Sequence, residues 1–241
     1  MANIVPLNSV AHRTLRVQAG AAARRGDTQR FVAVIVNEFS LLAPHYPILL
    51  SKDADTGTFY CGAMLGFDPG ENLYLHDPRD ADLYRPLNLQ RGPFFTAGSE
   101  LAIDLESPRI ASDGEGEPLF NESGVPTAYL ESIMALMREL QPGLKRTKVF
   151  VSTLMEMKLV EPMTIDVAFD DGTKRQVTDL YTIDQEALRA LADAPVVELF
   201  RRGYLQLIYL MIGSLKHIPR LAQAKNRRLL EGSESLGAAP R

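Results

Sequence analysis

The segment 68–77, DPGENLYLHD, gathers the side chains of this sequence that could most readily do chemistry. Its carboxylates and imidazole belong to Asp68, Glu71, His76 and Asp77. Such groups bind metal ions and act as general acids and bases. However, the four histidines of the chain are dispersed, and adjacent strand residues such as His76 and Asp77 point to opposite faces. Residues 68–71, Asp-Pro-Gly-Glu, fit a type II turn, so we predict a turn here, with no metal site and no cofactor.

Signatures of phosphate binding and nucleophilic catalysis are missing from the sequence. Gly62, Gly66 and Gly70 are evenly spaced, but no Gly-Lys-Ser/Thr follows them. No Gly-x-Ser-x-Gly or Ser-x-x-Lys occurs either. The single cysteine, Cys61, lies on an expected strand between apolar neighbours, where a free thiol is typically buried and inert. We therefore assign no catalytic residue and expect a role that is not enzymatic.

Aromatic and polar residues near expected strand ends form the candidate ligand site. Binding sites are mostly apolar with a few polar groups, and this combination surrounds the His45-Tyr46 pair. The candidates are Glu38, Phe39, His45, Tyr46, Glu71, Asn72, His76 and Asp104. Core packing is the simpler explanation of the aromatic members, and the binding interpretation stays open beside it. Glu71 and Asn72 are also expected to fix the turn through their hydrogen bonds.

Positive charge is concentrated toward the C-terminal end. Between residues 201 and 228 the chain has seven lysines and arginines and no acidic residue. They are Arg201, Arg202, Lys216, Arg220, Lys225, Arg227 and Arg228. This stretch is the candidate surface for a protein partner, although cations near a helix C-terminus also interact favourably with the helix dipole. The acidic loop 113–122 could face these charges within one chain or across a homodimer.

The elements that would position these groups begin with strands. Residues 31–36, 46–52 and 59–65 are apolar enough to be buried strands. Residues 72–76 and 100–105 alternate in polarity, as strands with one buried face do. The N-terminal half is therefore predicted to be mainly β.

The C-terminal half is predicted to be mainly helical. Leu130, Ile133, Met134 and Met137 recur at helical spacing. The helix that they define is expected to stop at Pro142-Gly143, and a second helix follows over about 144–159. A long last helix is expected to begin at Pro195 and to kink or end at Pro219.

One β-hairpin is predicted between these helices. Asp171-Gly172 joins two runs of alternating polarity, 163–169 and 173–181, which is a strong hairpin signal. Asp184 is then expected to cap a short helix. Strands first, then helices, a hairpin and a long C-terminal helix indicate the α+β class.

Composition bounds the setting of the protein. The 241 residues are 46% hydrophobic and 23% charged, and the net charge of −4 argues against a nucleic-acid binder. We expect one domain over 1–230, with a hinge in the Gly- and Pro-containing loop 111–126 and a disordered tail over 231–241. No stretch reaches the ~20 apolar residues of a membrane span, and residues 1–25 do not resemble a signal peptide. We therefore expect a soluble, cytoplasmic protein.

A series of segments along the chain is similar to the SapC family of bacterial proteins. The segments are VNEFSLLAPHYPILLSK (36–52), GFDPGENLYL (66–75), YRPLNLQRGPFF (84–95), GEPLFNESGVPT (116–127), LMEMKLVEP (154–162), LYTIDQEALRAL (180–191) and RGYLQLIYLMIGSL (202–215). The resemblance covers residues 6 to 228. It departs from the family pattern in lacking any Trp and in carrying Gly92-Pro93 where an aromatic-Pro pair is usual.

The family resemblance implies a biological context for the protein but no particular chemical reaction. The family is named for a link to a bacterial surface layer, and its genes often lie beside those for outer-membrane receptors and for halogenase-like or oxygenase-like proteins. It is distinct from the peptide-transporter permease of the same name, and it brings no catalytic residues to this chain. We favour a non-catalytic accessory or binding protein of a surface-layer or nutrient-uptake system. An enzyme or enzyme subunit with a site near His45, Tyr46 and His76, and a structural surface-layer component, stay open as alternatives. A homodimer through the apolar last helix is also predicted.

Overall fold

The computed structural model describes residues 3–20, 27–75, 80, 83–98, 100–111 and 114–237, with side chains to Glu231. The chain forms two compact units, and each of them is discontinuous in sequence. Unit 1 comprises residues 1–28 and 87–143, and unit 2 comprises residues 29–86 and 144–241. Mixed strands and helices confirm the α+β class. The single domain over 1–230 and the hinge within 111–126 stay predictions, whereas the last helix continues to Gly237, into the tail that was expected to be disordered from residue 231.

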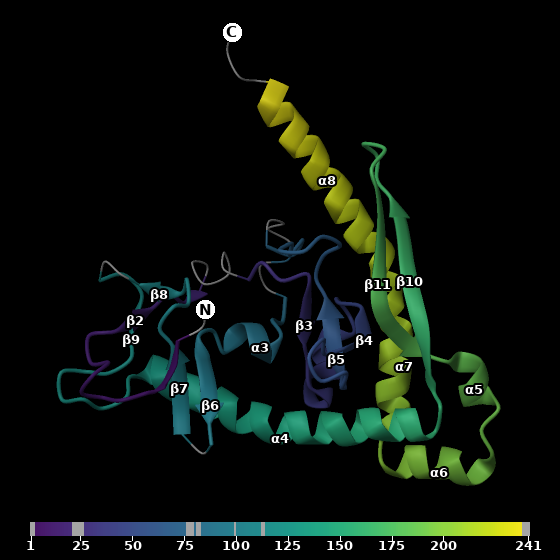
Figure 1. Ribbon diagram of the computed structural model, residues 1–241, viewed down its shortest axis with the longest axis horizontal. Coiled ribbons are helices and arrows are strands. Elements are labelled where there is room, and N and C mark those ends of the chain that lie inside the picture. Colours follow the sequence, from purple (N-terminus) through teal and green to yellow (C-terminus); the bar gives the residue numbers. More distant parts are fainter. Residues whose placement is uncertain are drawn as a thin grey trace. The chain divides into compact units, whose positions relative to one another are not determined.

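Unit 2 is built on a five-stranded antiparallel sheet with the strand order β10-β11-β4-β5-β3. Its strands are β3 (Phe31–Ala33), β4 (Ile48–Lys52), β5 (Phe59–Met64), β10 (Val160–Ala168) and β11 (Lys174–Ile183). The β10–β11 hairpin extends past the ends of β4 and β5 (Figure 1). The strands expected over 46–52 and 59–65 and the Asp171-Gly172 hairpin are confirmed.

Unit 2 also contains several helical segments. They are η1 (Val36–Glu38), α2 (Phe39–Leu42), α5 (Gln185–Arg189), α6 (Asp193–Arg201), α7 (Tyr204–Ser214), η3 (Leu215–His217) and α8 (Ile218–Gly237). Among these, α7 packs against β4 and β11 of the sheet. α7 is fastened to the sheet by Ser214, whose Oγ accepts the backbone N–H of Ile48 at 2.8 Å. Ile208 and Met211 of the same helix are fully buried. The Asp184 cap is confirmed, because its carboxylate accepts the N–H groups of Glu186 and Ala187.

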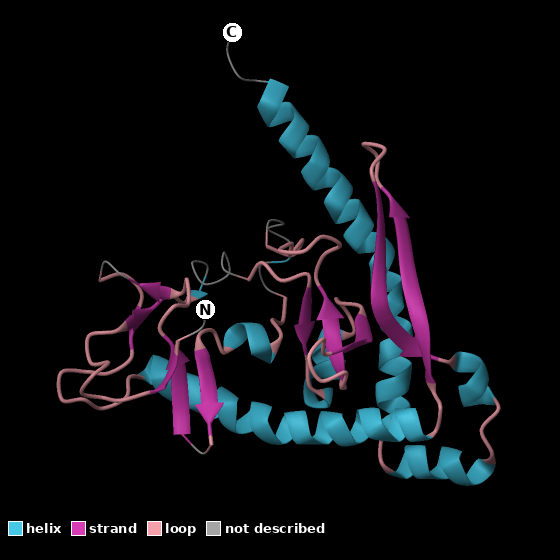
Figure 2. Cartoon of the chain, in the orientation of Figure 1, coloured by secondary structure: helices cyan, strands magenta, loops and turns pink. Residues whose placement is uncertain are grey.

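Unit 1 contains two small antiparallel sheets (Figure 2). One has the order β1-β7-β6, from β1 (Ile4–Pro6), β7 (Glu100–Asp104) and β6 (Phe94–Ala97). The other has the order β8-β2-β9, from β8 (Ile110–Ala111), β2 (Arg16–Val17) and β9 (Glu117–Pro118). α3 (Leu87–Gln90) and the first half of the long helix α4 (Ala128–Glu156) complete the unit. Its buried ion pair joins Arg109 to Asp27.

Three sequence predictions about elements are wrong. Residues 72–75 form no strand, because the Asn72 side chain accepts the N–H of Tyr74 and holds a turn there. α4 does not stop at Pro142-Gly143, since buried residues recur at helical spacing on both sides of it, as at Leu140 and Phe150. The last helix is not continuous from Pro195. It is broken at Gly203, which has a φ of +72°, and again by the 3₁₀ turn η3.

Candidate functional site

A tight turn at residues 68–71 forms one wall of the candidate site. The N–H of Glu71 donates to the Asp68 carbonyl at 3.1 Å, and Gly70 has a φ of +75°, as a type II turn requires. The Glu71 carboxylate folds back over the turn, where its Oε2 accepts the N–H groups of Phe67 at 3.0 Å and Asp68 at 3.3 Å. The expected roles of Glu71 and Asn72 as hydrogen-bonding residues of this turn are confirmed.

Lys225 of α8 is the cation that binds this turn. Its Nζ lies 2.8 Å from Asp68 Oδ2 and 2.5 Å from Glu71 Oε1. Burial alone would lower the pKa of Lys225, but the hydrogen bonds to Asp68 and Glu71 outweigh it and the pKa lies above its ordinary value. Burial would likewise raise the pKa of Asp68, yet Lys225 and Arg175 bring it below its ordinary value. Lys225 and Asp68 are therefore both charged near neutral pH.

The β10–β11 hairpin is joined to the same cluster. Arg175 Nε of β11 lies 2.6 Å from Asp68 Oδ1. At the hairpin turn, the N–H of Asp170 donates to Asn226 Oδ1 of α8 at 3.1 Å. The rings of Phe67 and Phe169 meet edge to face at 5.5 Å. The 68–71 turn, the β10–β11 hairpin and α8 are distant in sequence. They are connected by the ion pairs that Lys225 and Arg175 form with the turn, by the hydrogen bond to the Asn226 amide and by the contact between the two phenylalanine rings.

A cavity of about 800 Å³ lies beside this cluster, and we call it the Lys225 cleft. It is lined by Asp68, Pro69, Gly70, Glu71, Asp170, Asp171, Lys225, Asn226, Arg228, Leu229 and Leu230. The carboxylates of Asp68 and Glu71 are already compensated by Lys225 and Arg175. Asp170, Asp171 and Arg228 are exposed, and Leu230 is 57% exposed. The cleft can therefore offer charge and apolar surface to a ligand, and it contains no nucleophile beside a general base.

Glu38 and Phe39, which were predicted to bind a ligand, make contacts that stabilise the fold. Glu38 is buried and accepts the N–H of Ile35 at 2.9 Å, which caps η1, and the Tyr84 hydroxyl lies 3.3 Å from its second oxygen. Phe39 is fully buried and meets Phe150 edge to face at 6.2 Å. These contacts are those of a packed core.

Residues around His45 do form a compact aromatic group. The Tyr74 hydroxyl donates to the His45 carbonyl at 2.9 Å, and the Tyr46 and Tyr74 rings lie 4.5 Å apart. His217 is buried nearby, with its Nε2 3.0 Å from the Ala43 carbonyl. His76 lies outside the described residues.

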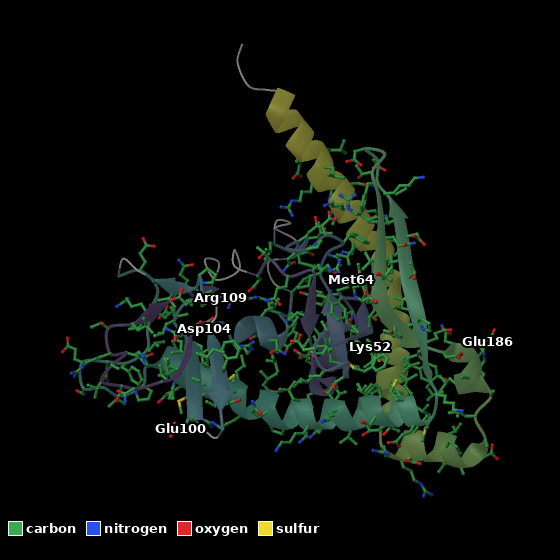
Figure 3. All side chains as sticks on the ribbon, viewed as in Figure 1. Lys52, Met64, Glu100, Asp104, Arg109 and Glu186 are labelled. Carbon is green, nitrogen blue, oxygen red and sulfur yellow. The ribbon has the colours of Figure 1, made fainter. Side chains whose placement is uncertain are left out.

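The remaining candidates fall in different places. Asp104 belongs to unit 1, where its carboxylate accepts the N–H of Asn3 at 2.8 Å at the end of β7 (Figure 3). Glu71 belongs to unit 2 and contacts Lys225. The eight ligand candidates are thus not gathered by their contacts into one site, and their role in binding stays a prediction.

The predicted basic surface contains residues that are used within the chain. Arg220 pairs with the buried Asp80 at 2.6 Å, and Arg202 pairs with Glu198 at 2.9 Å. Lys225 is only 13% exposed. Arg201, Lys216, Arg227 and Arg228 have exposed side chains. A partner surface on this stretch stays a prediction, and its accessible charge lies on these four residues and on the exposed parts of Arg202 and Arg220.

Sequence reasoning missed the residues that complete the cleft, namely Lys225 as a partner of Glu71, and Arg175 and Asp170. The sequence did contain an indication that Lys225 has an anionic partner. It lies four residues from both Leu221 and Leu229, on the apolar face of its helix, where a lysine needs a buried anionic partner. Nothing in the sequence identified that partner as Glu71, 154 residues away.

Among the described residues, no group of three or more His, Cys, Asp or Glu side chains could hold a metal ion. No helix in the part of the chain that the structure describes is both long and apolar enough to cross a membrane.

Comparison with known proteins places the chain in one family. The family model described as SapC matches residues 7–221, nearly the whole chain. No curated protein and no solved structure matches the chain.

Proposed function

Because the chain belongs to the SapC family, we propose that it is a non-catalytic binding protein whose partner docks in the Lys225 cleft. The observation that carries this proposal is the cleft itself. Its walls come from the 68–71 turn, the hairpin turn and α8, and these segments are held together by the buried Lys225–Glu71 pair, the Arg175–Asp68 pair and the hydrogen bond from Asp170 to Asn226. Such a preorganised concave surface lowers the entropic cost of binding.

The charges of the cleft favour a cationic segment of a partner protein. Four carboxylates and two basic residues line it, so the lining is net acidic. Since Lys225 and Arg175 compensate Asp68 and Glu71, the excess lies on Asp170 and Asp171 at the hairpin turn. Leu230 supplies apolar surface beside them. A lysine or arginine flanked by apolar residues fits this lining.

The biological setting follows from the family resemblance. We infer that the partner belongs to a bacterial surface-layer or nutrient-uptake system. The cytoplasm as the location, and a homodimer through the apolar α7–α8 region, belong to the same proposal.

The test is a crosslinking capture from the native host with matched variants. Asp170→Lys combined with Leu230→Lys reverses one of the two uncompensated carboxylates, replaces the apolar Leu230 by a cation, and leaves Lys225 and its partners intact. Asp55→Lys combined with Glu161→Lys places the same number of changes on exposed positions outside the cleft. We expect wild type and the control to capture the same protein and the cleft variant to lose it by about tenfold or more.

Equal capture by all three proteins would contradict the proposal. A purified partner then allows titration calorimetry, in which a peptide from its basic segment should bind wild type and should fail to bind the cleft variant. Far-ultraviolet circular dichroism of each variant confirms that the fold is kept.

A further inference from the structure

A second pocket lies where β11 leaves the sheet of unit 2. β11 pairs with β4 only through Leu180 and Tyr181. Just before them, the register with β10 shifts between Met163 and Ile165, so Thr178 and Asp179 together lie opposite Thr164. Asp179 has a φ of +61°, the left-handed conformation that such a bulge imposes. The Ser51 hydroxyl of β4 donates to the Asp179 carbonyl at 2.9 Å, and β-bulges are frequent beside active sites.

The pocket has a volume of about 230 Å³. Its apolar lining includes Phe31, Met64, Val177 and Leu180, and Met64 marks the β5 part of this sheet in Figure 3. The Phe31 ring lies over Gly62, where an added Cβ would come within 2.2 Å of it, and meets Tyr60 edge to face at 5.9 Å. At about 30 Å³ per water, this space suits a molecule equal to roughly seven waters.

Two opposite charges line this pocket without pairing. Arg30 and Asp179 are both lining residues, yet no ion pair joins them among the contacts of the described residues. The Arg30 guanidinium is half-buried, and its contact with the Phe67 carbonyl is long, at 3.5 Å. Asp179 Oδ2 is 3.2 Å from the Thr178 hydroxyl. Each charge therefore keeps bonding capacity for a ligand, and a half-buried arginine gains from a carboxylate partner.

We propose that this pocket binds a free α-amino acid with a small or medium apolar side chain. The ligand carboxylate lies on Arg30, whose planar fork suits bidentate carboxylate binding. The ligand ammonium lies on Asp179, and the apolar side chain lies against Phe31, Met64 and Leu180. A free amino acid is the simplest ligand that carries both charges and an apolar group within this volume. This inference uses none of the residues of the Lys225 cleft and is independent of the function proposed for it.

The test uses the full chain, differential scanning fluorimetry and titration calorimetry with the twenty L-amino acids. We expect an apolar member such as L-leucine, L-valine or L-methionine to raise the melting temperature and to bind with one-to-one stoichiometry. N-acetyl-L-leucine lacks the ammonium and L-leucinamide lacks the carboxylate. Each should bind at least about tenfold more weakly than L-leucine, because each leaves one pocket charge without a partner.

Two variants assign the binding to this pocket. Asp179→Asn keeps a residue that tolerates the left-handed conformation and removes the charge, and Arg30→Gln removes the guanidinium. Each should weaken binding by about tenfold, whereas the Asp170→Lys, Leu230→Lys variant of the cleft should bind as wild type does. Absence of binding by every amino acid, binding of either derivative as tight as that of L-leucine, or unchanged binding by a correctly folded Asp179→Asn would each overturn the proposal.

Discussion

At the scale of single residues, burial decides which charges of this protein are structural. Lys225 and Arg228 are three positions apart on α8, yet the first is almost enclosed and the second is exposed. Lys225 faces Glu71, which also accepts two backbone N–H groups. A buried carboxylate with this many donors is costly to leave without its cation. The basic stretch 201–228 therefore contains two sets of residues. One set forms ion pairs within the fold, and the other has side chains exposed to solvent.

Replacing Lys225 should therefore destabilise the protein strongly. In Lys225→Met the apolar stem remains, but Glu71 stays buried without its cation, so we expect the free energy of unfolding to fall by about 3 kcal/mol. Arg175→Gln is the matched control, since its pair with Asp68 is largely exposed, and it should change the free energy of unfolding far less than Lys225→Met does. Urea denaturation followed by circular dichroism measures both. Equal losses in the two variants would show that burial of the Lys225 pair does not matter.

His217 should make stability depend on pH. Burial lowers the pKa of His217 below its ordinary value of 6.5, and the charges of Lys216, Arg220 and His45 lower it further, against the hydrogen bond to Ala43. The unfolded chain then binds more protons than the folded one between the two pKa values. This contribution to stability is complete above about pH 6.5 and is lost as the pH falls through the folded pKa.

The variant His217→Gln isolates this effect. Glutamine can still donate to the Ala43 carbonyl but does not titrate, so the loss of unfolding free energy between pH 7 and pH 5 should be smaller than in wild type. Urea denaturation at several pH values measures it. Parallel pH profiles for the two proteins would mean that His217 makes no such contribution.

At the scale of elements, the sequence correctly predicted the features that a single local interaction determines. Asp171-Gly172 between alternating runs and the Asp184 cap are local signals, and both are confirmed. The 72–76 segment alternates as well, but the Asn72 side chain bonds to the Tyr74 N–H two residues on and favours a turn. A proline inside a helix, such as Pro142 in α4, removes one backbone hydrogen bond and clashes with the preceding turn. Burial of apolar side chains on both sides of it can offset that cost. Here the buried stripe of α4 continues past it, and it lies beside the 143/144 boundary between the units.

The close packing of Gly66 against the 68–71 turn predicts the effect of a glycine substitution on stability. A Cβ added at Gly66 would lie 2.6 Å from the Glu71 carbonyl oxygen, so Gly66→Ala must displace the turn that carries the cleft. We expect it to lower the free energy of unfolding by about 2 kcal/mol. Gly213→Ala, inside α7, meets nothing within 4 Å and should raise it by roughly 0.5–1 kcal/mol.

Thermal and urea unfolding measure the two glycine variants side by side. A loss of stability in Gly213→Ala would contradict the open space found around this position. A neutral Gly66→Ala would mean that the turn can shift at little cost.

At the scale of the whole molecule, the sequence could not predict the organisation of the site. The chain passes between the two units at 28/29, 86/87 and 143/144, and none of these points is marked by a long linker. The cleft joins residues 68, 170 and 225, and the second pocket joins residues 30, 60 and 179. Spacing rules act over a few residues, whereas these pairings follow from sheet order and helix packing. The turn chemistry of 68–71 was predictable, and the partners it holds were not.

The buried thiol of Cys61 reports on unit 2 as a whole. It is the single cysteine of the chain, lies in the middle of β5 with no exposed surface, and burial raises its pKa far above the ordinary value. A thiol reagent attacks the thiolate, so it can react only after the sheet opens. We expect a chromogenic disulfide reagent to leave the native protein unlabelled. With increasing urea, labelling should begin in the same range in which circular dichroism records unfolding. Rapid labelling without urea would show that β4 and β3 separate from β5 under native conditions, which the complete burial of Cys61 argues against.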